Sequence, residues 1–128
     1  MSDNDFGLTI YSVSFSSAPH LALNWELTRR LNEGEDHWEW IVAENTPEGM
    51  AGKLDAADRR FEVLPGVEPP HFAKHRGSYH HGAALNKIVG RGESRFILIL
   101  DPDFFIVRRD WIRQVIHYML ERQLALWG

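Results

Sequence analysis

The motif Asp101-Pro102-Asp103 combines two acidic side chains with a residue that stiffens the backbone between them. It follows five consecutive apolar residues, 96–100, which predict a strand buried on both faces. Pro102 fixes its own φ and disfavours helical geometry at Asp101, so we expect a rigid turn. Mg²⁺ and Mn²⁺ take oxygen ligands, often one or two carboxylates together with substrate phosphates. The motif therefore indicates a divalent-cation site, and the alternative is a plain polar turn at a strand end.

Polar and small residues also follow the other predicted strands. Glu44 comes after the strand predicted at 38–43 and can bond a base edge or a sugar, although this stretch alone favours an ordinary turn. Arg76 is a candidate for phosphate binding. The segment 77–87 carries small residues such as Gly82 near a helix N-terminus, where free N–H groups favour phosphate. Packing of that helix against the sheet explains these small residues equally well.

Four histidines lie within eleven residues and suggest zinc as a further possibility: His71, His75, His80 and His81. No Glu follows His71 as the H-E-x-x-H pattern requires, and the prolines before it argue against a helix. His81 lies on an apolar helical stripe, so we expect it to pack against the core. The sequence therefore disfavours a zinc cluster.

The elements that would position these residues alternate along the chain. Strands are predicted at residues 8–15, 38–43, 61–64 and 96–100, and helices at 19–32, at 78–89 and from about Asp110. A short helix at 50–60 and a strand beginning at 124–127 are further expectations. This alternation predicts an α/β domain with an open, mostly parallel sheet and helices on both faces. Such sheets bind ligands beyond the carboxyl ends of their strands, which gathers the candidate residues into one crevice.

Two local signals place the helices more closely. Ser17 and Asp110 precede apolar periodic segments and are predicted N-caps. In the first helix the apolar residues Leu23, Leu27 and Leu31 recur every four residues. These leucines mark the expected apolar row of that helix.

Composition narrows the possible classes of protein. The chain has 128 residues, a formal net charge of −4 and no cysteine, which excludes disulfides and thiolate metal sites. The length predicts a single domain at 8–128 preceded by a flexible tail at 1–7. No apolar run is long enough for a membrane span, and the N-terminus lacks the features of a secretory signal, so we expect a cytoplasmic protein. The mild negative charge argues against nucleic acid as a partner.

Several segments together resemble the nucleotide-binding half of the GT-A glycosyltransferases, above all the family-two sugar-nucleotide-dependent transferases. They are LTIY running into VSFSSAPHLALNWELTRRLN, then WEWIVAEN, GSYHHGAALNKIVG and RFILILDPDFFIV, in the family's order. The resemblance implies a three-layer, Rossmann-like GT-A fold and hexosyl transfer from a UDP- or GDP-sugar to an acceptor that the sequence leaves open. It also implies Mn²⁺ or Mg²⁺ as the cofactor.

The resemblance implies roles at the first two strand ends. Ser14, Phe15 and Ser16 match residues that lie along the base in that family. Glu44 matches a position that usually carries an Asp in contact with the base. It is one methylene longer than that Asp, so the resemblance implies a base contact through a longer side chain.

The resemblance also implies how the diphosphate is held. Asp101 matches the acid that meets the ribose, and Asp103 matches the acid that binds the metal bridging the diphosphate. Gly82 and Asn86 lie on what resembles the family's small-residue helix beside the nucleotide. Arg76 or His81 would then lie near the diphosphate.

The chain departs from the family at its end. Family members continue into an acceptor-binding half that carries the catalytic base of the inverting enzymes, whereas this chain stops at Gly128. We therefore expect a donor-binding part that does not complete transfer alone, because deprotonation of the acceptor needs a base.

Two other classes of protein remain open. A phosphohydrolase of the haloacid-dehalogenase type also carries D-x-D after an apolar strand, but on its first strand. A non-catalytic interaction module is the other. An incomplete sheet edge beside residues 124–127 invites strand pairing, either by self-association or with a missing C-terminal segment.

Overall fold

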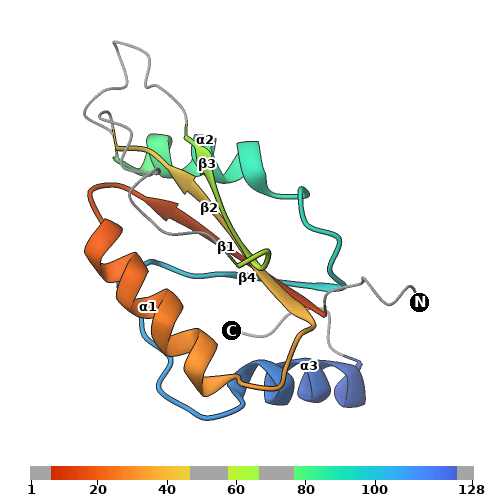
Figure 1. Ribbon diagram of the computed structural model, residues 1–128. Helices are drawn as coiled ribbons and strands as arrows, with labels where there is room; N and C mark the ends of the chain where they lie inside the picture. Colours follow the sequence, from red (N-terminus) through yellow and green to blue (C-terminus); the bar gives the residue numbers. More distant parts are fainter. Residues whose placement is uncertain (1–6, 47–57, 67–76, 124–128) are drawn as a thin grey trace.

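The computed structural model describes residues 7–46, 58–66 and 77–123, with the backbone alone for 77–80. In chain order the elements are β1 (Leu8–Ser14), α1 (Ala18–Leu31), β2 (Trp38–Glu44), β3 (Phe61–Pro65), α2 (Gly77–Ile88), β4 (Phe96–Ile99) and α3 (Trp111–Arg122), as Figure 1 shows. The helix predicted at 50–60 lies largely outside the described residues, as do the strand predicted at 124–127 and the tail before Gly7. Each helix in the described ranges is too short or too polar to cross a bilayer.

The sheet confirms the predicted α/β class. Its four strands are all parallel and lie in the order β3-β2-β1-β4. Helices α1 and α3 pack on one face and α2 on the other, which makes three layers (Figure 1). The chain passes from β1 to β2 on one side and later returns to the other side of β1 for β4, so the strand order reverses beside β1. Open α/β sheets bind ligands at such a reversal.

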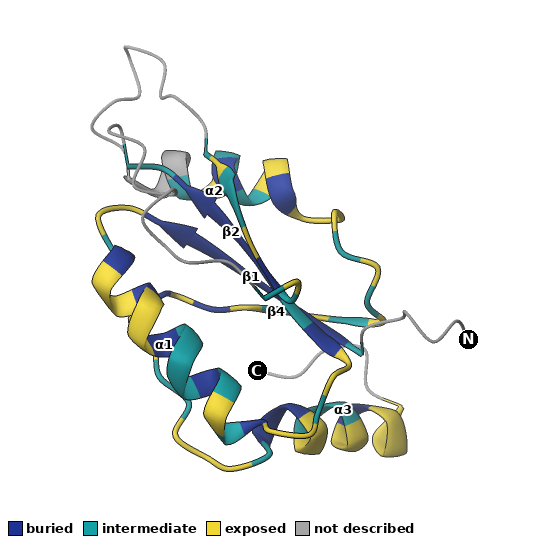
Figure 2. Ribbon diagram, in the orientation of Figure 1, coloured by how far each residue is buried: buried dark blue, intermediate teal, exposed yellow. Residues whose placement is uncertain are grey.

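The buried face of α1 differs from the predicted leucine row. Leu23 is 61% exposed, whereas Leu21, Asn24 and Thr28 are buried (Figure 2). Two polar residues face the sheet because the Asn24 amide finds backbone acceptors there and Thr28 donates to the Asn24 side chain. Leucine spacing alone does not reveal these acceptors, which belong to a segment almost eighty residues further along the chain.

The prediction that residues 96–100 are buried on both faces was wrong. Among the described strands β4 pairs with β1 alone, so it lies at an edge, and its burial alternates (Figure 2). Ile97 is 56% exposed and Ile99 is 52% exposed. Their register with Thr9 and Tyr11 puts them on the α2 face, but α2 contacts β1 and β2 instead. An unbroken apolar run does not distinguish an edge strand from a central one.

Ser17 and Asp110 occupy the N-cap positions of α1 and α3, as predicted, but neither side chain makes a cap hydrogen bond. The Ser17 hydroxyl donates instead to the Phe15 carbonyl at 2.9 Å. Asp110 has a left-handed backbone with φ of 61°, and its carboxylate makes no cap hydrogen bond. Asn32, at the end of α1, accepts the Ile112 N–H of α3 at 3.0 Å. The cap of α3 therefore comes from another helix.

Candidate functional site

Ser14 and Glu44 are neighbours in the sheet register, at the carboxyl ends of β1 and β2. Ser14 is fully buried and Glu44 is 4% exposed. The Ser14 hydroxyl oxygen and the Glu44 Oε2 atom are both buried, and neither has a hydrogen-bond partner among the described residues. A buried polar atom in this state costs about 1–3 kcal/mol, so the adjacent ends of β1 and β2 are a candidate place for a ligand that would supply the missing partners.

The other oxygen of Glu44 is held in place by Thr46. The Thr46 N–H donates to Oε1 at 3.0 Å, and the Thr46 hydroxyl donates to the same oxygen. The Ser16 N–H in turn donates to the Thr46 hydroxyl at 2.7 Å, which ties the loop after β1 to the loop after β2. This arrangement orients the carboxylate, and it leaves the buried Oε2 atom without a partner among the described residues. Thr46 was not predicted, because its position after Asn45 and before Pro47 reads as ordinary turn chemistry.

The Asp101-Pro102-Asp103 turn is closed by the Phe104 N–H, which donates to the Asp101 carbonyl at 3.0 Å. Pro102 is buried, while both acids are exposed. The Asn24 side chain donates to the Pro102 carbonyl at 3.1 Å and to the Phe104 carbonyl at 2.8 Å. The turn is therefore anchored by α1, and both of its acidic residues are exposed.

A second anchor lies just before this turn. The Ser12 hydroxyl donates to the Leu100 carbonyl at 2.5 Å and accepts the Trp40 indole N–H at 2.9 Å. Both side chains are fully buried. The end of β4 is thus fixed to β1 and, through Trp40, to β2.

His81 is the described side chain that the structure brings to the Asp101 carboxylate. Its Nε2 atom lies 3.8 Å from the Asp101 Oδ1 atom, and both side chains are partly exposed. The expectation that His81 packs against the core was wrong: its side chain is 42% exposed, and the core on this face includes Ala84 and Ile88 further along α2 but not His81. A histidine beside a carboxylate at a strand end can donate to an anionic ligand or exchange a proton with it.

The other predicted site residues that the structure describes add no side chain to the contacts of Glu44 and Asp101, although the Ser16 backbone N–H bonds Thr46. Phe15 is 62% exposed, and Ser16 is exposed with φ of 52°. Gly82 and Asn86 are exposed one turn apart on α2. A methyl group at Gly82 would meet no described atom within 4 Å, so packing against the described part of the sheet does not require glycine there. Arg76 lies outside the described residues.

A positive charge that sequence reasoning missed lies beyond the end of β3. The Lys87 ammonium group donates to the carbonyls of Pro65 and Gly66 at 2.9 and 3.0 Å. The Gly66 N–H donates to the Glu44 carbonyl at 2.7 Å, so Lys87 is connected through one residue to the end of β2. Lys87 lies near the end of α2 among exposed residues, and this position in the sequence did not indicate that it binds the two carbonyls.

Acidic and histidine side chains are the groups in this chain that could hold a metal ion. In the described ranges no three His, Asp or Glu side chains gather into a ready-made metal site. Asp101 and Asp103 are both exposed on this turn. Sites for Mg²⁺ often use one or two carboxylates together with substrate phosphates. For the zinc alternative, His71 and His75 and the side chain of His80 lie outside the described residues.

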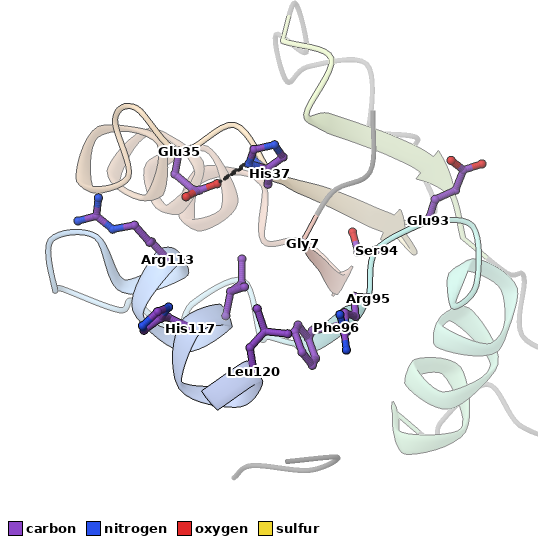
Figure 3. A pocket seen from close by; sticks show the side chains of 11 residues that line it. Gly7, Glu35, His37, Glu93, Ser94, Arg95, Phe96, Arg113, His117 and Leu120 are labelled. Atoms are coloured by element: carbon purple, nitrogen blue, oxygen red, sulfur yellow. Dashed lines mark hydrogen bonds and ion pairs between the residues drawn. The ribbon is translucent and has the colours of Figure 1, made fainter. Parts of the chain in front are cut away.

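Two cavities lie away from the carboxyl edge. One, of about 510 Å³, lies at the amino ends of β1 and β4 beside α3. Figure 3 shows Glu35 and His37 on one wall, 3.2 Å apart, with Arg113 and His117 of α3 nearby. The other is an apolar groove of about 830 Å³ along β4 and α3. Neither cavity could be predicted from local sequence patterns, because its walls combine residues from distant segments.

Neither any known family model nor any curated protein sequence matches this chain.

Proposed function

We propose that this chain binds a nucleoside-diphosphate sugar with Mn²⁺ or Mg²⁺, as the donor-binding part of a GT-A-type hexosyltransferase. The observation that carries the proposal is the pair of unpartnered buried atoms at adjacent strand ends, Ser14 Oγ and Glu44 Oε2. Uracil and guanine both offer ring N–H donors, which suit a free carboxylate oxygen. A UDP- or GDP-sugar would satisfy both atoms and remove the cost of leaving them unpaired.

The second support for the proposal is the turn at the end of β4. Asp101 and Asp103 are exposed acids on a turn that Asn24 anchors. In the proposed complex Asp101 accepts hydrogen bonds from the ribose hydroxyls and Asp103 binds the cation. A divalent cation there would neutralise negative charge on the departing diphosphate. His81, 3.8 Å from Asp101, adds a donor for phosphate oxygens.

The sheet topology is the third support. The Ser14 and Glu44 pair follows β1 and β2, and the Asp101-Pro102-Asp103 turn follows β4. These two groups therefore lie on either side of the point where the strand order reverses. Ligands of open α/β sheets bind at this point. The proposal covers donor binding and assigns no base for deprotonating the acceptor.

Calorimetric titration with UDP and with GDP, each with and without Mn²⁺, tests this proposal. We expect binding that requires Mn²⁺ and that Asp103→Asn weakens at least about tenfold, since one charged metal ligand is lost. Asp36→Asn is the matched control, because Asp36 is also an exposed acid but precedes β2 at the opposite end of the sheet. Glu44→Gln should weaken binding with Mn²⁺ present and leave the Mn²⁺ requirement in place. Absent binding, or binding that neither Mn²⁺ nor Asp103→Asn changes, would overturn the proposal.

A further inference from the structure

The outer edge of β4 is apolar on both faces and lacks a neighbouring strand among the described residues. On the α2 face, Ile97 and Ile99 are more than half exposed. On the α3 face, the 830 Å³ groove is lined by Phe96, Leu98, Phe104, Ile106, Val115 and Tyr118, among others. Native proteins usually cover or charge such an edge, because its free N–H and C=O groups pair readily with another strand.

A buried donor supports an occupant in this groove. Trp111 lines the groove and is 3% exposed, and its indole N–H has no hydrogen-bond partner. A buried N–H without an acceptor is costly, so a small opening of the groove that let an occupant supply a carbonyl or hydroxyl oxygen would be favourable. A polypeptide edge supplies such acceptors together with apolar side chains.

We propose that the occupant is a second copy of this chain, whose β4 pairs antiparallel with the first around a two-fold axis at Leu98. In this register each Ile97 lies opposite Ile99 of the other copy, and each Arg95 lies opposite Asp101 of the other copy. Because a two-fold axis repeats every contact, the interface contains two isoleucine pairs and two oppositely charged pairs. Cross-strand pairs of both kinds stabilise antiparallel sheets.

The charge pattern selects this register. Arg95 precedes β4 and Asp101 follows it, both are exposed, and they are equally distant from Leu98 along the chain. An antiparallel neighbour therefore brings opposite charges together at both ends of the strand. A parallel neighbour in register would place Arg95 beside Arg95 and Asp101 beside Asp101, which is repulsive.

The handedness of the connections argues against the chain's own residues 124–128 as a parallel neighbour of β4. Helix α1 joins β1 to β2 across one face, moving away from β4. Helix α3 packs on that same face. A right-handed crossover over this face moves in the same direction, so a parallel strand after α3 on the outer side of β4 would need a left-handed crossover, which is very rare.

Sedimentation equilibrium of the full chain over about a hundredfold concentration range tests this inference. We expect a monomer of 14.8 kDa in equilibrium with a species of twice that mass. Ile99→Lys should raise the dissociation constant at least about tenfold, because it puts a charge into the paired apolar surface. Leu23→Lys is the matched control, because Leu23 lies on the exposed side of α1. This variant should leave the monomer–dimer equilibrium unchanged. Far-ultraviolet circular dichroism checks that both variants are folded.

A charge swap tests the register. Arg95→Glu and Asp101→Arg should each weaken the dimer about tenfold or more through like-charge repulsion, and the double variant should restore most of the wild-type affinity. A monomer at every concentration would overturn the proposal and leave residues 124–128 or a different protein as the occupant. A dimer that Ile99→Lys does not weaken, or a double variant no tighter than the single ones, would also overturn it. The readout is oligomeric mass without nucleotide, so this inference and the proposed donor binding fail independently.

Discussion

The side-chain amide of Asn24 donates a hydrogen bond to the carbonyl of Pro102 at 3.1 Å, and so joins α1 to the turn that carries the two exposed acids. The same nitrogen also donates to the Phe104 carbonyl. Asn24 is fully buried, and its bond to the Pro102 carbonyl is buried as well, whereas the bond to the Phe104 carbonyl is partly buried. The position of this turn therefore depends on a buried residue of α1.

Replacing Asn24 by Ala should lower the free energy of unfolding by about 1–3 kcal/mol, because the Pro102 carbonyl loses its buried donor. Urea denaturation measures this loss, and Leu23→Ala on the exposed side of α1 should change stability by less than about 0.5 kcal/mol. The Asn24→Ala variant should also bind nucleotide with Mn²⁺ more weakly at temperatures where it remains folded. An equal loss in both variants would show that the Asn24 bonds do not stabilise the turn.

Ser14 and Ser12 provide a matched pair on one strand, because both are fully buried and lie on the same face of β1. The Ser14 hydroxyl oxygen has no partner, whereas the Ser12 hydroxyl joins Trp40 to Leu100. We expect Ser14→Ala to be neutral or to stabilise by up to about 1 kcal/mol, and Ser12→Ala to destabilise by about 1–3 kcal/mol.

Thermal and urea unfolding of the two variants measure this difference. If Ser14 serves a ligand, Ser14→Ala should also weaken nucleotide binding although the protein is no less stable. Equal destabilisation by Ser14→Ala and Ser12→Ala would contradict the assignment of Ser14 as a residue held for a ligand.

Helix α3 should depend on Asn32 more than on its own N-cap residue. Asn32 is fully buried, accepts the Ile112 N–H and donates to the Thr28 carbonyl at 2.8 Å. Asn32→Ala should cost about 1–3 kcal/mol in urea unfolding. Asp110→Asn keeps a side chain that tolerates the left-handed backbone and should cost less than about 0.5 kcal/mol, since Asp110 makes no cap bond. A larger loss at Asp110 than at Asn32 would contradict this account.

The sequence predicted the class of fold because strand and helix patterns are local. The strands at 8–15 and 38–43 and the Gly90 stop of α2 could be read from neighbouring residues, and the structure agrees within a residue or two. The rule that ligands bind beyond the carboxyl ends then pointed to Glu44 and Asp101 without any knowledge of contacts.

The remaining features depend on contacts between distant segments. No local pattern shows that Asn24 finds its acceptors at Pro102, so the leucine row was the natural but wrong choice for the buried face of α1. The apolar run 96–100 likewise gave no sign that β4 lies at an edge, because edge position is a property of the whole sheet. The two unpartnered atoms of Ser14 and Glu44 became visible only with coordinates.

Glu39 should make the free energy of unfolding depend on pH, and the substitution Glu39→Gln should remove that contribution. Burial raises the pKa of the Glu39 carboxyl above its usual value of 4.5, and the nearby acids Glu62 and Glu93 raise it further. The Thr9 hydroxyl, 3.0 Å from Glu39 Oε1, donates a hydrogen bond that lowers this pKa. Its effect is smaller than that of burial, so the pKa stays raised.

The sign follows from proton binding. Below pH 4.5 the Glu39 carboxyl is protonated in the folded and in the unfolded chain, and its contribution to stability is fully present. As the pH rises through 4.5 the unfolded chain releases its proton first, so this contribution is lost progressively until the pH exceeds the pKa of the folded state.

The substitution Glu39→Gln places a side chain that cannot ionise at this position. At pH 7 the variant should therefore be more stable than the wild type, by less than about 1 kcal/mol because the carboxyl is partly solvated. Urea unfolding at pH values from about 3.5 to 7 measures both proteins, and the two curves should converge at the acidic end. Parallel curves, with the same difference at every pH, would show that Glu39 titrates alike in the folded and unfolded states.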